Sequence, residues 1–60
     1  MARINKENAK RLAVAYSAYN ERCANQDADG AKVWAGMLKK AQIATGIELI
    51  SEEYLNMVLA

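Results

Sequence analysis

The amino-acid sequence predicts an all-α fold: a small three-helix domain with two long antiparallel helices and a shorter C-terminal helix. Large apolar residues recur every three or four positions, which is the spacing of one face of an α-helix. Proline is absent, and turn-forming residues gather in the segment NQDADG (25–30) and around Gly46. Sixty residues suffice for one domain at most, so we expect residues 1–60 to form a single helical domain.

The first predicted helix spans about residues 5–25, a segment without glycine or proline. Asn5 is a suitable N-cap, and Glu7 follows in the first turn, where a carboxylate is stabilised by the positive end of the helix dipole. Apolar residues spaced by three and four positions form the expected buried seam of this helix: Ala9, Leu12, Tyr16, Tyr19 and Cys23.

The second predicted helix spans about residues 28–45, with Asp27 or Asp29 as its cap. Gly46 can adopt the left-handed conformation that ends a helix. Gly36 lies in the interior and costs about 1 kcal/mol relative to alanine, which we interpret as a tolerated weakness. We expect the buried face to carry Trp34, Met37, Leu38, Ala41 and Thr45, and the opposite face to carry Lys32, Lys39, Lys40 and Gln42.

The third predicted helix spans about residues 52–59, capped by Ser51. At 100° per residue its large apolar side chains cover an arc of about 200°, roughly twice what packing on one neighbour requires. We therefore expect this helix to touch two surfaces. These are either both other helices or one helix and a second chain. The arc consists of Tyr54, Leu55, Met57, Val58 and Leu59.

Composition limits how such a small domain can be stabilised. A 60-residue chain buries only about 60% of its unfolded surface, and twelve of its apolar residues are alanines, which bury little area. Cys23 is the only cysteine and histidine is absent, which excludes an internal disulfide and a zinc site of cysteine and histidine within one chain. Helix packing or self-association must supply the stability, and we expect neither a metal nor a cofactor.

One stretch has the beginning of a calcium-binding loop. In NQDADGAKVWAG (25–36), Asn25, Asp27, Asp29 and Gly30 fall on positions 1, 3, 5 and 6 of an EF-hand loop. Position 12, which needs a bidentate glutamate, is Gly36. We therefore predict that the aspartates form a turn and a helix cap.

Enzymatic, membrane and secretory functions are not indicated. Without histidine, Cys23 has no base near neutral pH, and Glu52 and Glu53 project about 100° apart as charges of a first helical turn. No apolar run approaches the length of a membrane span, and residues 1–11 lack the apolar segment of a secretory signal. We expect a cytoplasmic protein that is not an enzyme.

The leading functional hypothesis is a protein-interaction module, motivated by the wide apolar arc and the small core. It would self-associate as a homodimer or cap a larger cellular protein, in the manner of a small accessory protein or regulator of a phage or plasmid. The candidate partner-binding residues are Tyr19, Trp34, Tyr54, Leu55, Val58 and Leu59.

The alternative is a small nucleic-acid-associated regulator that binds the phosphate backbone through the first helix, using Arg3, Lys6, Lys10 and Arg11. The formal charge of +1 and the lack of a nearby aromatic residue for base stacking argue against it. A solvated helix face, or ion pairs to the acidic C-terminal third with Glu48, Glu52 and Glu53, explains the same charges.

Overall fold

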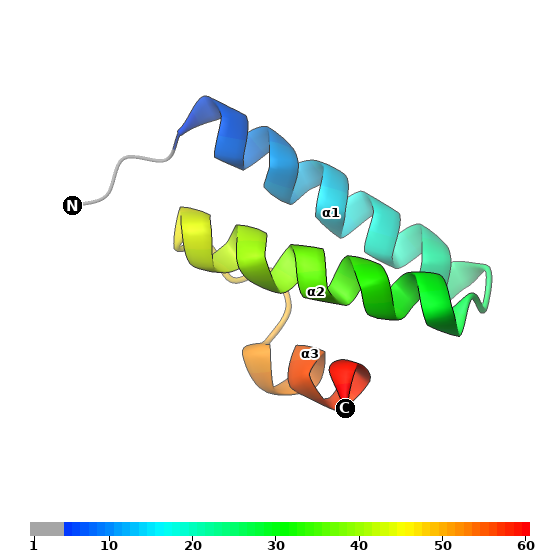
Figure 1. Ribbon diagram of the computed structural model, residues 1–60. Helices are drawn as coiled ribbons and strands as arrows, with labels where there is room; N and C mark the ends of the chain where they lie inside the picture. Colours follow the sequence, from blue (N-terminus) through cyan, green and yellow to red (C-terminus); the bar gives the residue numbers. More distant parts are fainter. Residues whose placement is uncertain (1–4) are drawn as a thin grey trace.

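The computed structural model describes residues 5–60, so Arg3 lies outside the described part of the chain. Its three helices are α1 (Lys6–Ala24), α2 (Ala28–Thr45) and α3 (Glu52–Leu59). The predicted all-α three-helix fold is confirmed. Figure 1 shows α1 and α2 as an antiparallel hairpin, with α2 lying between α1 and α3. Within residues 5–60, no helix is both long and apolar enough to cross a membrane.

Each helix begins at an N-cap that the sequence predicts. The side chain of Asn5 accepts a hydrogen bond from the Glu7 amide at 2.8 Å. Asp27 accepts from the Gly30 amide at 3.0 Å. Ser51 accepts from the Tyr54 amide at 3.2 Å. Each cap satisfies one of the N–H groups that the first helical turn leaves without a partner.

The turn between α1 and α2 is closed by backbone hydrogen bonds. The amide of Asp27 donates to the Arg22 carbonyl at 2.9 Å, and that of Gln26 to the Cys23 carbonyl at 3.1 Å. This is the Schellman pattern of a helix C-terminus, with Gln26 in its left-handed position at φ 58°. Since α2 starts at Ala28, inside the calcium-like segment, and Asp27 serves as its cap, that segment has the predicted turn and capping role.

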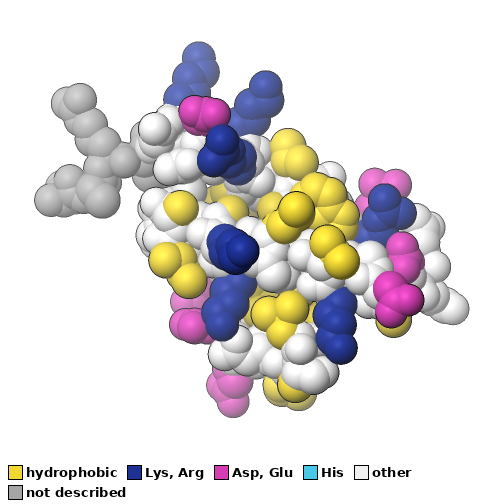
Figure 2. Space-filling model, viewed as in Figure 1, with side chains coloured by type: hydrophobic (Ala, Val, Ile, Leu, Met, Phe, Trp, Pro, Cys, Tyr) yellow, Lys and Arg dark blue, Asp and Glu magenta, His cyan; other side chains and the backbone are white. Residues whose placement is uncertain are grey.

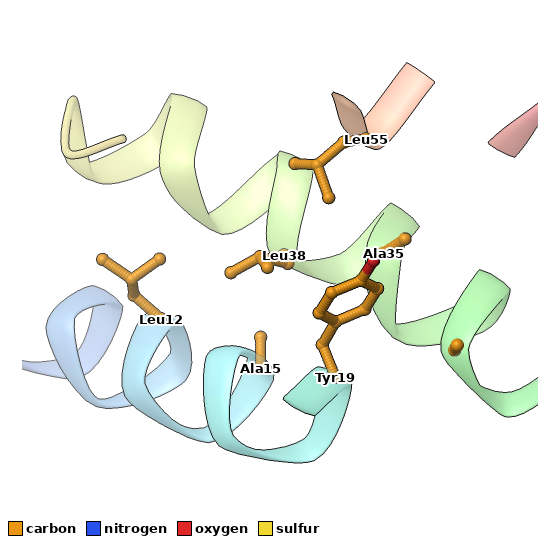
Figure 3. Packing of buried hydrophobic residues seen from close by; sticks show 7 residues of the cluster. Leu12, Ala15, Tyr19, Ala35, Leu38 and Leu55 are labelled. Atoms are coloured by element: carbon orange, nitrogen blue, oxygen red, sulfur yellow. The ribbon is translucent and has the colours of Figure 1, made fainter. Parts of the chain in front are cut away.

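The core consists of small and medium-sized side chains from all three helices. In Figure 3, Leu12, Ala15 and Tyr19 lie on the side of α1 that faces α2. Alanines at the contact allow the two helix backbones to approach closely. The predicted seam of α1 is only partly right, because Tyr16 and Cys23 are exposed. Among residues 5–60, the buried core consists of Leu12, Ala15, Tyr19, Ala31, Ala35, Leu38 and Leu55.

The buried face of α2 is rotated from the predicted face by about 60°. Gln42, expected on the exposed side, is buried, whereas Met37, expected inside, is exposed. Gln42 is buried because it makes hydrogen bonds there: its side-chain carbonyl accepts from the Leu49 and Ile50 amides at 2.7 and 2.8 Å. Its amide group donates to the Ile50 carbonyl at 3.0 Å. Gln42 thereby holds the loop before α3 against α2.

Helix α3 packs mainly against α2; within residues 5–60 its backbone does not come close to that of α1, and it meets α1 through side chains, with Tyr54 beside Tyr19. The amide of Gly46, at φ 73°, donates to the Gln42 carbonyl and ends α2 as predicted. A Cβ on Gly36 would lie 3.8 Å from the Leu59 side chain, an ordinary contact, so Gly36 is not required for close packing. The expectation that α3 touches both other helices in a monomer is met on the α1 side only through side chains such as Tyr54, because the loop held by Gln42 keeps the α3 backbone against α2.

Candidate functional site

A groove of about 650 Å³ runs between α1 and α2. It lies on the opposite side of α2 from α3, because Gly36 and Lys39, which approach α3, are about half a helical turn away from Met37 and Ala41, which line the groove. Figure 2 shows hydrophobic side chains gathered over the hairpin with Lys and Arg side chains beside them. The groove is lined by apolar Val14, Ala15, Trp34, Met37, Ala41 and Ala44 and by polar Glu7, Asn8, Lys10, Arg11 and Lys40.

The apolar part of the groove is open to solvent. Val14 is 52% exposed and Met37 is 50% exposed, and between them Trp34 is half-buried against the core. Met37 is exposed because the buried face of α2 lies on the side of Gln42 and not on the side of Met37. Apolar side chains that share one concave surface lose contact with water together when a partner covers them.

Basic side chains stand at one end of the groove, where α1 begins and α2 ends. Arg11 donates a hydrogen bond to Glu7 at 3.2 Å, which neutralises one charge of each sign. Lys10 and Lys40 take part in none of the ion pairs found within residues 5–60. This end of the groove therefore carries two lysine charges that are not balanced by an ion-pair partner.

The structure separates the sequence-predicted partner residues into three groups. Trp34 lines the groove, and Tyr54 is exposed on α3. Val58 and Leu59 are half-buried and pack against the core. Leu55, with 0% of its surface exposed, and Tyr19, with 3%, belong to the core of the chain itself and are not accessible to a partner. Apolar character alone does not distinguish a core position from an interface position, because both exclude water.

Val14, Met37 and Lys40 are groove residues that sequence reasoning did not select as partner-binding. Met37 was expected inside and Lys40 on the solvent face of the same helix. A signal was present for Val14, which follows Lys10 by four positions and so shares a helix face with it. The sequence pattern alone does not show which face of α2 is buried, and it is this orientation that brings the three side chains to one surface.

The basic residues of α1 are exposed, and the acidic C-terminal third does not neutralise them. Glu52 of α3 lies 3.9 Å from Lys39 of α2, and Lys39 also donates to Asn56 at 2.6 Å. Within residues 5–60, none of the ion pairs joins α1 to α3. The expected ion pairs between the basic residues of α1 and the acidic C-terminal third are therefore not found. Glu52 of α3 instead pairs with Lys39 of α2, because α3 packs on α2.

Tyr19 is an ionisable residue buried in the core. Burial raises its pKa above the ordinary value of 10.0, and the neighbouring side chains of Tyr54 and Cys23 raise it further. Tyr54 thus brings a polar group of α3 near α1. The Tyr19 hydroxyl remains protonated at neutral pH.

Within residues 5–60, no group of three Cys, Asp or Glu side chains is placed to hold a metal ion. No protein-family model, no curated protein and no solved structure matches this chain. The groove and its charges are therefore the features of the molecule that indicate a function.

Proposed function

We propose that the protein is a non-enzymatic protein-interaction module that self-associates through an exposed apolar surface. The observation that carries this proposal is the groove between α1 and α2, where Val14 and Met37 are half exposed next to Trp34. A domain with so few fully buried large side chains, Leu38 and Leu55 in the described part of the chain, gains stability when a partner covers further apolar area. Aromatic anchors such as Trp34 are frequent at the energetic centre of interfaces.

Self-association is tested by the molar mass in solution, measured by light scattering over a series of chain concentrations. We expect the mass to rise from that of one chain, 6.6 kDa, toward a multiple of it as the concentration increases. A mass that stays at one chain throughout contradicts self-association. Because apolar burial supplies most of the affinity, moderate salt should weaken self-association far less steeply than it weakens binding to phosphate.

A second candidate function, binding to a nucleic-acid backbone, is favoured by one observation. Lys40 of α2 joins Lys10 and Arg11 of α1 at the same end of the groove, and Lys6 is exposed on α1. Four contacts to phosphate would weaken binding steeply with salt, with a slope of about −3.6 in a double-logarithmic plot.

Fluorescence anisotropy of a labelled duplex at low and moderate salt tests this candidate. The variant Lys6→Gln/Lys10→Gln/Arg11→Gln should lose binding if α1 contacts phosphate. Unchanged anisotropy on addition of the wild-type protein at low salt rules the candidate out.

A further inference from the structure

We propose that the groove side of the α1–α2 hairpin is the interface of a symmetric homodimer, in which two copies pack antiparallel as a four-helix bundle. The inference rests on the proposed self-association and names its surface, its occupant and its register. The observations that carry it are the positions of four charged residues, two toward each end of the hairpin, with exposed apolar side chains between them.

The two unpaired lysines at one end of the hairpin have acidic counterparts at the other end. Glu21 lies eleven residues after Lys10 on α1, and Asp29 lies eleven residues before Lys40 on α2. Eleven residues are almost three whole helical turns, within about 20°, so each pair shares one helix face and is separated by about 16 Å. The hairpin therefore presents two positive charges at one end and two negative charges at the other.

The two arginines near this face are paired within the chain. Arg11 pairs with Glu7 at the basic end, and Arg22 lies 3.8 Å from Asp27 at the acidic end. Lys10, Glu21, Asp29 and Lys40 are all exposed, and none has an ion-pair partner among the described residues. These four side chains are consequently free to pair with another molecule.

The register of the charges suits a twofold axis. The midpoint between Lys10 and Glu21 falls next to Ala15, and the midpoint between Asp29 and Lys40 falls next to Trp34. Ala15 and Trp34 both line the groove, so the two midpoints lie near the same level of the hairpin. An axis through this level places the basic end of each copy opposite the acidic end of the other, as an isologous interface requires.

The centre of that interface is apolar. Val14, Trp34 and Met37 lie there, and Val33 stands exposed beside them on α2. Their burial supplies the affinity, while the charges at both ends fix the orientation. A parallel arrangement would bring lysine against lysine and carboxylate against carboxylate. Because α3 lies on the opposite side of α2, it does not obstruct the approach of a second hairpin.

Charge reversal with rescue tests whether these four charges meet across the interface. The variant Lys10→Glu/Lys40→Glu carries acidic groups at both ends, and Glu21→Lys/Asp29→Lys carries basic groups at both ends. We expect each variant alone to dissociate at least about tenfold more readily than the wild type, because four attractive pairs become repulsive. An equimolar mixture of the two should recover dimers containing one chain of each, detected by light scattering and native mass spectrometry.

Since the four positions are exposed, circular dichroism of each variant should retain the helical spectrum. Asp29 lies in the first turn of α2, where lysine is unfavourable. Glu21→Lys, mixed with Lys10→Glu, therefore provides a second swap that leaves this turn intact. If neither mixture recovers dimers, the antiparallel register is wrong.

Three apolar positions locate the surface. Met37→Asp should abolish dimers, whereas Ile43→Asp, a matched change at a 71% exposed position outside the groove, should not. If Met57→Asp on α3 disrupts the dimer and Met37→Asp does not, the groove assignment is overturned while self-association stands. A wild-type chain that is monomeric at every concentration overturns both. Wild-type dimers that form only with added duplex DNA also overturn this interface and favour the nucleic-acid candidate.

Discussion

Two left-handed residues, one unfavourable and one favourable, set the ends of the long helices. Gln26 adopts φ 58° after α1, and Gly46 adopts φ 73° after α2. A residue with a Cβ atom in this conformation costs about 1–2 kcal/mol, whereas glycine adopts it without a steric penalty. The same backbone requirement is thus met by a suitable residue at one helix end and an unsuitable one at the other.

We expect Gln26→Gly to stabilise the fold by about 0.5–1 kcal/mol, since the relief of strain exceeds the entropy that glycine adds to the unfolded chain. Gly46→Ala should lower the stability by about 1 kcal/mol for the opposite reason. Urea unfolding followed by circular dichroism measures both changes. Equal effects of the two substitutions in the same direction would contradict the assigned conformations.

The buried hydroxyl of Tyr19 makes stability depend on alkaline pH. Its pKa is raised in the folded chain by burial, so above about pH 10 the unfolded chain loses this proton while the folded chain retains it. The stabilisation is complete below about pH 10 and is lost as the pH rises further. Tyr19→Phe should therefore reduce the slope of unfolding free energy against pH between about pH 9 and 11.

The exposed Tyr16 provides the control for this experiment, since Tyr16→Phe removes a hydroxyl that is not buried. Identical slopes for wild type and Tyr19→Phe would show that burial of the Tyr19 hydroxyl does not matter for stability.

At the scale of the element, the position of α3 depends on one polar side chain. Gln42 is buried and makes hydrogen bonds to the backbone of Leu49 and Ile50. Gln42→Ala leaves two amides and a carbonyl without these partners, which should cost about 1–3 kcal/mol. Gln42→Glu keeps an acceptor for the two amides but lacks the donor, so an intermediate loss is expected. Chemical denaturation distinguishes the two variants, and a neutral Gln42→Ala would contradict the role of the side chain.

What could be predicted from the sequence was local. The caps at Asn5, Asp27 and Ser51 use backbone groups two or three residues away, so their chemistry is readable along the chain. The partners of Gln42 are seven and eight residues away across a loop, and no local rule connects them. The wide apolar arc of α3 predicted how much surface needs cover, but it did not predict which neighbour covers it.

The same limit applies to the candidate site. Trp34 was expected on the buried face of its helix and as a partner anchor, and it lies half-buried in the groove. Leu55 was assigned to an interface and lies at the centre of the core. Both residues are apolar and follow helical spacing, so their sequence patterns are equivalent. Only the packing of the helices separates them, because Leu55 of α3 joins the core cluster with Leu38 whereas Trp34 of α2 lines an open groove.

If the chain forms the proposed dimer, its stability against unfolding depends on the chain concentration. An interface that forms only between folded chains shifts the unfolding equilibrium by mass action. We expect the thermal midpoint of the wild type to rise as the chain concentration increases, and that of Met37→Asp to remain constant. Met37 is half exposed in one chain, so this substitution should leave the fold intact. A wild-type midpoint that does not change with concentration would contradict the coupling.

The central place of α2 has a consequence for how the molecule opens. Helix α1 and helix α3 each pack on α2, and within residues 5–60 their backbones do not come close to one another. Release of α3 therefore exposes Leu55, one side of α2 and the Tyr19 side chain beside Tyr54, but it leaves the backbone contact between α1 and α2 in place. Local openings of this kind have their own free energy, below that of global unfolding. Backbone amides of α3 should exchange with deuterium before those of the hairpin, and they should do so at the same rate whether or not the groove is occupied.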